Sequence, residues 1–265
     1  MVARRSLAAA ANMQVTFHRL GIARALVASA GLLAATAVFA ADEPQAYEVD
    51  AGFDTAPQSL YWYKEAIVAL NRDIAKSGFL MRLSGGVAVY NYAGPTGATI
   101  DGTLWQFDAM PGYQYVRGAE TFGASIGLDY QDSLLSPNDP TNPVRGTALG
   151  FKVALNYDFQ DDKKPFEASL AGEYSTAFET YYAELRVGAR LSDKLSLGPA
   201  AEVDGTTGYN GQRLGAYATY DFDLAKGVTL DVTLVGGHQF VSGDGEAGPS
   251  GGAGTYGTLE LTTNF

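Results

Sequence analysis

Long runs in which apolar and polar residues alternate one by one dominate this chain. In the segment 122–131, every second residue is apolar and the residues between are Gly123, Ser125, Gly127, Asp129 and Gln131. Because strand side chains point alternately to opposite faces, such runs predict long strands with one apolar and one polar face. The chain is therefore predicted to be all-β, with about twelve strands near residues 46–55, 59–70, 78–92, 105–115, 122–131, 149–160, 166–176, 180–191, 195–204, 212–222, 228–241 and 254–265.

The connections between these strands fall into two sets that alternate along the chain. One set is short, as in "RGAE", "SDK" and "DLAKG". The other set includes long stretches rich in glycine or proline, at 93–101, 132–146, 205–211 and 242–253. Short turns at one end and long loops at the other are typical of outer-membrane barrels. An even number of strands then places both termini on the periplasmic side.

Three features predict that the apolar face points outward. A closed barrel of about twelve strands is too wide for side chains to fill, since about eight strands is the size that they fill. The polar face is charged, and aromatic residues such as Trp105 and Tyr157 stand near strand ends on the apolar face. We therefore expect a closed antiparallel transmembrane β-barrel in the outer membrane of a Gram-negative bacterium, in contact with its lipid. On this interpretation Val153→Arg should be costly and Lys152→Ala mild.

The two ends of the chain support export. Residues 1–40 hold four arginines, no acidic residue and the apolar run "ALVASAGLLAATAVFA", which ends on small residues. This order predicts a signal peptide cleaved after Ala40, with 41–265 as the barrel; an anchoring helix is the alternative, and Met13 is an alternative start. At the other end, "GTLELTTNF" finishes on an aromatic residue, which is typical of the signal read by the bacterial barrel-assembly machinery.

The mature chain offers little for catalysis or for nucleic acid. Cleavage would leave 14 basic and 29 acidic residues, a net charge of about −15, which disfavours nucleic acid. There is no cysteine, so neither a disulfide nor a thiol nucleophile is available. His238 is the one histidine of residues 41–265, and "GDGEAGPSGGAGT" at 243–255 matches neither a P-loop nor an EF-hand. No enzyme activity, metal or cofactor is expected.

Several segments together resemble one protein family. The segments are "GLDYQD", "LSPNDPTNPVRGTALGFKV", "ASLAGEYSTAFETYYAELRVG", "GQRLGAY" and "GHQFVSGDG". They resemble the cellulose biosynthesis protein BcsS over residues 46–265. The resemblance implies a non-catalytic accessory role in bacterial cellulose production or export, with cellulose or other parts of the synthase system as partners. It implies no catalytic residues. A narrow channel for small solutes and, less favoured, an enzyme acting on lipid or polysaccharide are the alternatives.

The candidate contacts for a saccharide lie on the polar face and in one loop. The loop "SPNDPTNPVRG" at 136–146 contains three prolines, which remove hydrogen-bond donors and prevent it from adding strands. It is predicted to be a shaped lid over the barrel mouth, or else a rigid connector. Arg145 is expected to fold toward the lumen wall, with Tyr130 and Asn138 near the saccharide. The full candidate set is Arg82, Asp108, Asp129, Tyr130, Asn138, Arg145, Lys152, Glu173, Glu184, Arg186 and Arg213.

Overall fold

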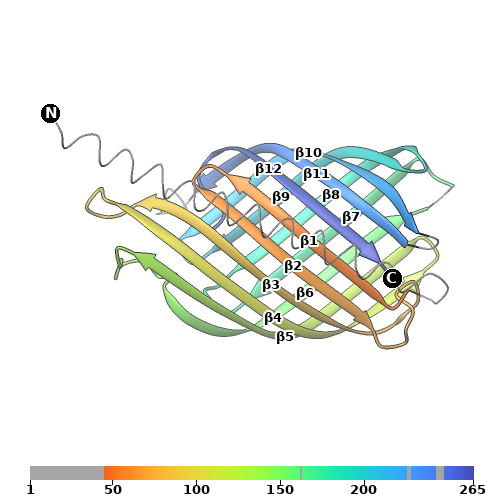
Figure 1. The fold of residues 1–265 in the computed structure, drawn as a ribbon, viewed down its shortest axis with the longest axis horizontal. Helices are drawn as coiled ribbons and strands as arrows, with labels where there is room; N and C mark the ends of the chain where they lie inside the picture. Colours follow the sequence, from red (N-terminus) through yellow and green to blue (C-terminus); the bar gives the residue numbers. More distant parts are fainter. Residues whose placement is uncertain (1–44, 162, 226–227, 243–247) are drawn as a thin grey trace.

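A computed structural model describes residues 45–161, 163–225, 228–242 and 248–265, and it confirms the all-β prediction (Figure 1). The predicted signal peptide lies outside the described residues. No helix in the described ranges is long and apolar enough to cross a membrane. The strands are β1 (Tyr47–Ala56), β2 (Ser59–Ala69), β3 (Gly78–Ala93), β4 (Thr99–Arg117), β5 (Glu120–Ser136), β6 (Gly146–Gln160), β7 (Phe166–Ser175), β8 (Tyr181–Ser192), β9 (Leu195–Thr206), β10 (Tyr209–Ala225), β11 (Val228–Ser242) and β12 (Gly254–Asn264).

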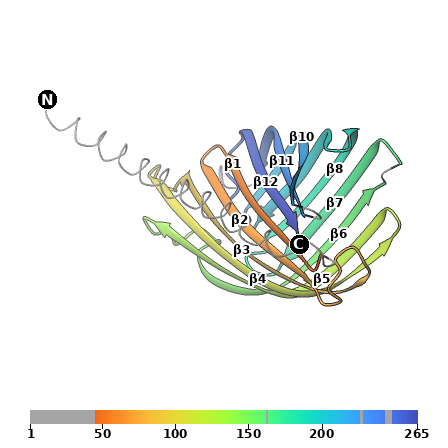
Figure 2. The ribbon, with the colours of Figure 1, turned by 45° about the vertical axis from the view of Figure 1, so that its right-hand side comes forward.

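The twelve strands form one closed antiparallel barrel (Figures 1 and 2). Each strand pairs with its neighbours in sequence, and β1 pairs with β12 from Glu48↔Asn264 to Thr55↔Gly257. Closure leaves no free sheet edge, so the ladder hydrogen bonds are completed within the chain. A strand can therefore stand in a lipid environment without exposing unpaired backbone groups.

The two ends of the barrel differ in their connections. One end, which we call the terminal end, holds the start of β1, the end of β12 and turns such as 118–119 and 193–194. The opposite end, the loop end, carries the connections 94–98 and 137–145. The prediction of a long loop at 205–211 is wrong. The connection between β9 and β10 has only two residues. A hairpin this tight requires a positive φ, and Gly208 adopts a φ of 83°.

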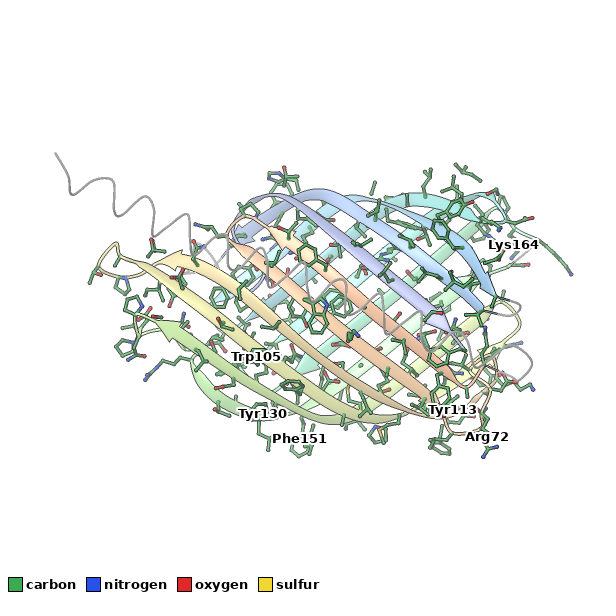
Figure 3. All side chains as sticks on the ribbon, in the orientation of Figure 1. Arg72, Trp105, Tyr113, Tyr130, Phe151 and Lys164 are labelled. Atoms are coloured by element: carbon green, nitrogen blue, oxygen red, sulfur yellow. The ribbon has the colours of Figure 1, made fainter. Side chains whose placement is uncertain are left out.

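The apolar face of the strands points outward, as predicted. On β5, Leu128 is 51% exposed, whereas its neighbour Asp129 is 0% exposed and faces the lumen. Trp105 is also exposed, and Figure 3 shows Phe151 projecting away from the barrel wall. The exterior is therefore apolar and the lumen polar, which is the arrangement that a membrane-spanning barrel requires.

The C-terminal residue closes the barrel at the terminal end. The backbone N–H of Phe265 donates to Tyr47 and the N–H of Tyr47 donates back, each at 2.9 Å, and the two rings stack at 5.7 Å.

Deleting Phe265 should lower the fraction of chain that folds, because the β1–β12 seam loses its last backbone bonds and a ring worth about 1.5–3 kcal/mol of burial. Heat-modifiable mobility on semi-native gels measures that fraction. Phe240→Ala, which truncates an exposed aromatic on the outer face of β11, is the control and should fold normally. Equal folding of the deletion and the control would contradict this role.

Candidate functional site: the barrel lumen

A cavity of about 410 Å³ lies in the lumen, and we call it the main cavity. Tyrosines line it from several walls: Tyr61 and Tyr63 of β2, whose rings stack at 5.7 Å, with Tyr182 of β8 and Tyr209 of β10. Its volume lies within the range of small-molecule sites, and aromatic faces beside charged groups suit a ligand with both apolar and hydroxyl-bearing surfaces.

Ion pairs near this cavity link strands that are not neighbours in the barrel wall. Arg82 of β3 binds Glu65 of β2 at 2.7 Å and Glu173 of β7 at 3.1 Å. Lys152 of β6 binds Asp108 of β4 at 2.9 Å and the same Glu173 at 2.6 Å. Three strands separate β3 from β7, so this network ties together walls that are not neighbours.

Two further arginines make similar cross-lumen contacts. Arg186 of β8 binds Glu184 at 2.7 Å and Glu260 of β12 at 2.6 Å, using both sides of its guanidinium for the latter. Arg213 of β10 binds Asp54 of β1 at 2.9 Å and Glu202 of β9 at 3.2 Å. Paired guanidinium–carboxylate contacts are strong and directional, so these residues hold the lumen in one arrangement.

Arg186 also lines a second, smaller cavity. The smaller cavity, about 190 Å³, lies toward the terminal end and is lined by Glu167, Arg190 and Tyr217 among others. Arg186 lines both cavities. The ion-paired side chain of Arg186 therefore stands in the wall of both cavities.

The proline-rich loop 137–145 folds onto the wall at the loop end. Asp139 is buried and accepts hydrogen bonds from the Tyr92 hydroxyl at 2.9 Å and from the backbone and hydroxyl of Thr141. Asn142 donates to the Tyr92 hydroxyl at 2.7 Å, and Val144 is also buried. The Thr141 hydroxyl, as the main cause, holds the pKa of Asp139 below its usual range. The anchor should therefore persist at mildly acidic pH and be lost only as pH falls through that depressed pKa.

Removing this anchor should free the loop. Asp139→Ala eliminates the acceptor for Tyr92 and Thr141, so we expect faster cleavage by trypsin after Arg145, which is exposed in the same loop. The cleavage rate of the folded barrel is the measurement. Asn138→Ala, at an exposed neighbouring position, should leave the rate unchanged. Identical rates for both variants would show that Asp139 does not hold the loop.

The neighbouring connections also turn inward at the loop end. Phe178 of the β7–β8 connection packs against a buried cluster of Ala88, Tyr90 and Leu104 inside the barrel wall. In the β11–β12 connection, the carbonyl oxygen of Ser250 accepts from Arg213 at 3.3 Å. The roof of the main cavity is thus built partly from loop residues.

The structure brings together most, but not all, of the predicted contact residues. On the lumen side lie Arg82, Asp108, Asp129, Lys152, Glu173, Glu184, Arg186 and Arg213. Three others do not join them. Tyr130 is 40% exposed on the outer face of β5 (Figure 3), so its placement near a lumen ligand is wrong: it has the opposite parity to Asp129. Asn138 and Arg145 are exposed at the loop end, and Arg145 does not fold toward the lumen wall.

The structure also changes the expectation for Lys152. The mild effect predicted for Lys152→Ala assumed a solvated lumen side chain. Lys152 is instead 5% exposed and bridges two carboxylates, so its removal leaves buried charge without compensation.

Sequence reasoning missed the residues that β1 and β2 contribute. Tyr61, Tyr63, Glu65 and Asp54 all line the main cavity. In "LYWYKEAIVAL" both alternating sets are largely apolar, so periodicity does not assign a face. Charge does not assign the face either, because Lys64 and Glu65 are adjacent and stand on opposite faces.

The described residues offer no catalytic constellation that we recognise. His238 is exposed on the outer face of β11, where its ring meets Phe240 at 4.8 Å, away from the lumen carboxylates. No group of three or more His, Asp or Glu side chains in the described ranges is arranged to hold a metal ion. The first five residues of the glycine-rich stretch 243–255 lie outside those ranges.

A closed twelve-stranded barrel with an apolar exterior and a charged lumen defines the class of outer-membrane β-barrels. Within that class, the family model for the cellulose biosynthesis protein BcsS matches residues 50–265, and the chain belongs to this family. No curated protein sequence matches the chain.

Among solved structures, the chain is similar to the KdgM porin at 12% identity and TM-score 0.40, covering 82% of this chain and 99% of that one. It is similar to the β domain of the Bordetella autotransporter Brka at 13% identity and TM-score 0.46, covering 83% and 98%. The translocator domain of autotransporter NalP from Neisseria meningitidis is 11% identical at TM-score 0.42, covering 92% and 97%.

Proposed function

We propose that the protein is a non-catalytic accessory barrel that handles the glucan product of cellulose biosynthesis at the outer membrane. Membership of the BcsS family supports a role in cellulose biosynthesis. The observation that carries the proposal is the main cavity, in which tyrosine rings stand beside carboxylates and guanidinium groups. Pyranose rings present apolar C–H faces that pack on aromatic rings, and hydroxyls that bond to charged acceptors and donors.

The cross-lumen ion pairs favour surface handling over free passage of a chain. Arg82–Glu173 and Arg186–Glu260 both span the lumen, so a polymer could thread it only after these contacts separate. A saccharide segment held under the loop-end connections needs no such rearrangement. On this proposal the termini are periplasmic, the loop end faces the cell surface, and the barrel-assembly machinery inserts the chain.

The test is a clean deletion strain complemented with the wild-type gene or with Tyr61→Ala/Tyr63→Ala. The paired variant should give a folded barrel but altered amount or location of cellulose. Tyr113→Ala/Tyr115→Ala, on the outer face of β4, is the matched control and should restore cellulose fully. Normal cellulose with the lumen variant would contradict the proposal. A large, steady single-channel conductance of the wild-type barrel would favour a solute channel instead.

A further inference from the structure

The wall of the main cavity carries more carboxylates than basic groups. Eight aspartate and glutamate side chains line it, against four basic ones, Arg82, Lys152, Arg186 and Arg213. Such an imbalance in a confined site surrounded by low-dielectric walls concentrates one sign of potential. The cavity should therefore attract positively charged ligands and repel negatively charged ones.

The ion pairs account for six of these eight carboxylates. Arg82 forms an ion pair with Glu65, and Lys152 forms one with Glu173. Arg186 forms ion pairs with Glu184 and Glu260. Asp54 and Glu202 share Arg213, as described above. The basic groups are thus already engaged, with more than one carboxylate contact each.

Two lining carboxylates, Asp50 and Asp204, have no basic partner within ion-pair distance among the described residues. Asp50 of β1 accepts a hydrogen bond from the Thr262 hydroxyl at 2.6 Å. Asp204 of β9 is 6% exposed and has no basic group of the described ranges within 4 Å; the groups that favour its charge are the Ser250 hydroxyl and, at longer range, the Arg213 guanidinium. The basic groups of the cavity are already bound to other carboxylates, so Asp50 and Asp204 are the positions at which its acidic wall can attract an added positive charge.

A bare metal ion does not meet this demand well, because the acidic side chains of the described ranges do not converge as a metal site. A sugar that carries an ammonium group fits the cavity better than a bare ion. The tyrosine rings can pack against the sugar ring, and the carboxylates in excess attract the ammonium charge at longer range. A uronate carries a negative charge, so the same acidic wall would repel it.

We propose that the main cavity selects saccharides by charge, favouring those that carry an ammonium group over neutral ones, and neutral ones over those that carry a carboxylate. This selectivity rests on the proposed saccharide-handling function. Asp50 and Asp204 are the specificity-determining residues, since they are the two lining carboxylates without a direct ion pair in the described structure.

The test compares three β-1,4-linked disaccharides on the folded full-length barrel in detergent, by isothermal titration calorimetry. The probes are the glucosamine dimer, cellobiose and a dimer ending in glucuronate, at a pH where the amine is protonated and the lining carboxylates are ionised. We expect the amine probe to bind about tenfold tighter than cellobiose and the uronate about tenfold weaker. Asp50→Asn/Asp204→Asn keeps the side-chain shape and should bring these ratios close to one. Asp223→Asn, an exposed carboxylate on the terminal end, should leave them unchanged.

The outcomes separate the two proposals. Equal affinity of the wild-type protein for all three probes would overturn charge selectivity and leave saccharide handling intact. Binding of the amine probe without any binding of cellobiose or of longer neutral glucans would overturn glucan handling and leave charge selectivity intact. Unchanged ratios in the paired variant would show that Asp50 and Asp204 do not set the preference.

Discussion

Lys152→Met should destabilise the barrel by about 3–5 kcal/mol, because removing one partner of a buried ion pair leaves the other charge uncompensated. The Lys152 ammonium is the shared partner of Asp108 and Glu173, and its side chain is 7% exposed. Methionine preserves most of the volume, so the loss reports charge more than packing. Unfolding of the refolded barrel in guanidinium chloride, followed by tryptophan fluorescence, measures the change.

Two control variants separate the loss of a buried charge from other effects of Lys152→Met. Lys194→Met removes a lysine from the exposed pair with Asp223 at the terminal end, and it should change stability little. Lys152→Met/Asp108→Asn removes charge from both sides of one contact and should recover part of the loss. If Lys152→Met is as mild as Lys194→Met, the lumen is more hydrated at this point than the structure indicates.

Val153→Arg should cost about 2–4 kcal/mol and should reduce insertion of the barrel into lipid, since it places a cation on the membrane-facing wall. Val153 is 43% exposed on the outer face of β6, directly opposite Ile126 on β5 and Tyr174 on β7. No carboxylate is paired with it in either register. Folding yield into lipid vesicles and the midpoint of chemical unfolding both measure the effect.

Asn156→Arg on the same strand is the matched control. Asn156 faces the lumen and donates to Asp158 at 3.2 Å, so an arginine there would stand beside a carboxylate. It should fold and insert close to normally. Similar losses for both substitutions would mean that the two faces of β6 are assigned wrongly.

The alternating pattern determined the fold class of this protein because side-chain direction along a strand is a local property. In β5 and β6 one face is consistently apolar and the other polar, so the strands, their two faces and the closed barrel follow from the sequence. The same parity places Asp129 and Lys152 in the lumen. It also places Tyr130 outside, and assigning that tyrosine to a lumen contact departed from the pattern.

Local pattern gave no information where both faces of a strand are similar or where the chain leaves the strand. In β2 the tyrosines could have faced either way, and only closure against β1 and β3 directs Tyr61 and Tyr63 inward. In the loop 137–145 the prolines indicated rigidity, but the burial of Asp139 depends on Tyr92, a residue of β3.

The sequence by itself determined that this acidic chain forms long two-faced strands and belongs with a cellulose biosynthesis family. The tertiary structure decided which charges meet. Arg186 reaches Glu260 and Arg213 reaches Asp54 across two or three intervening strands, through contacts set by barrel diameter and strand stagger. Neither quantity is encoded in the period of any one strand. The cross-lumen ion pairs, and the two lining carboxylates that they leave without a direct basic partner, therefore appear only once all twelve strands have closed.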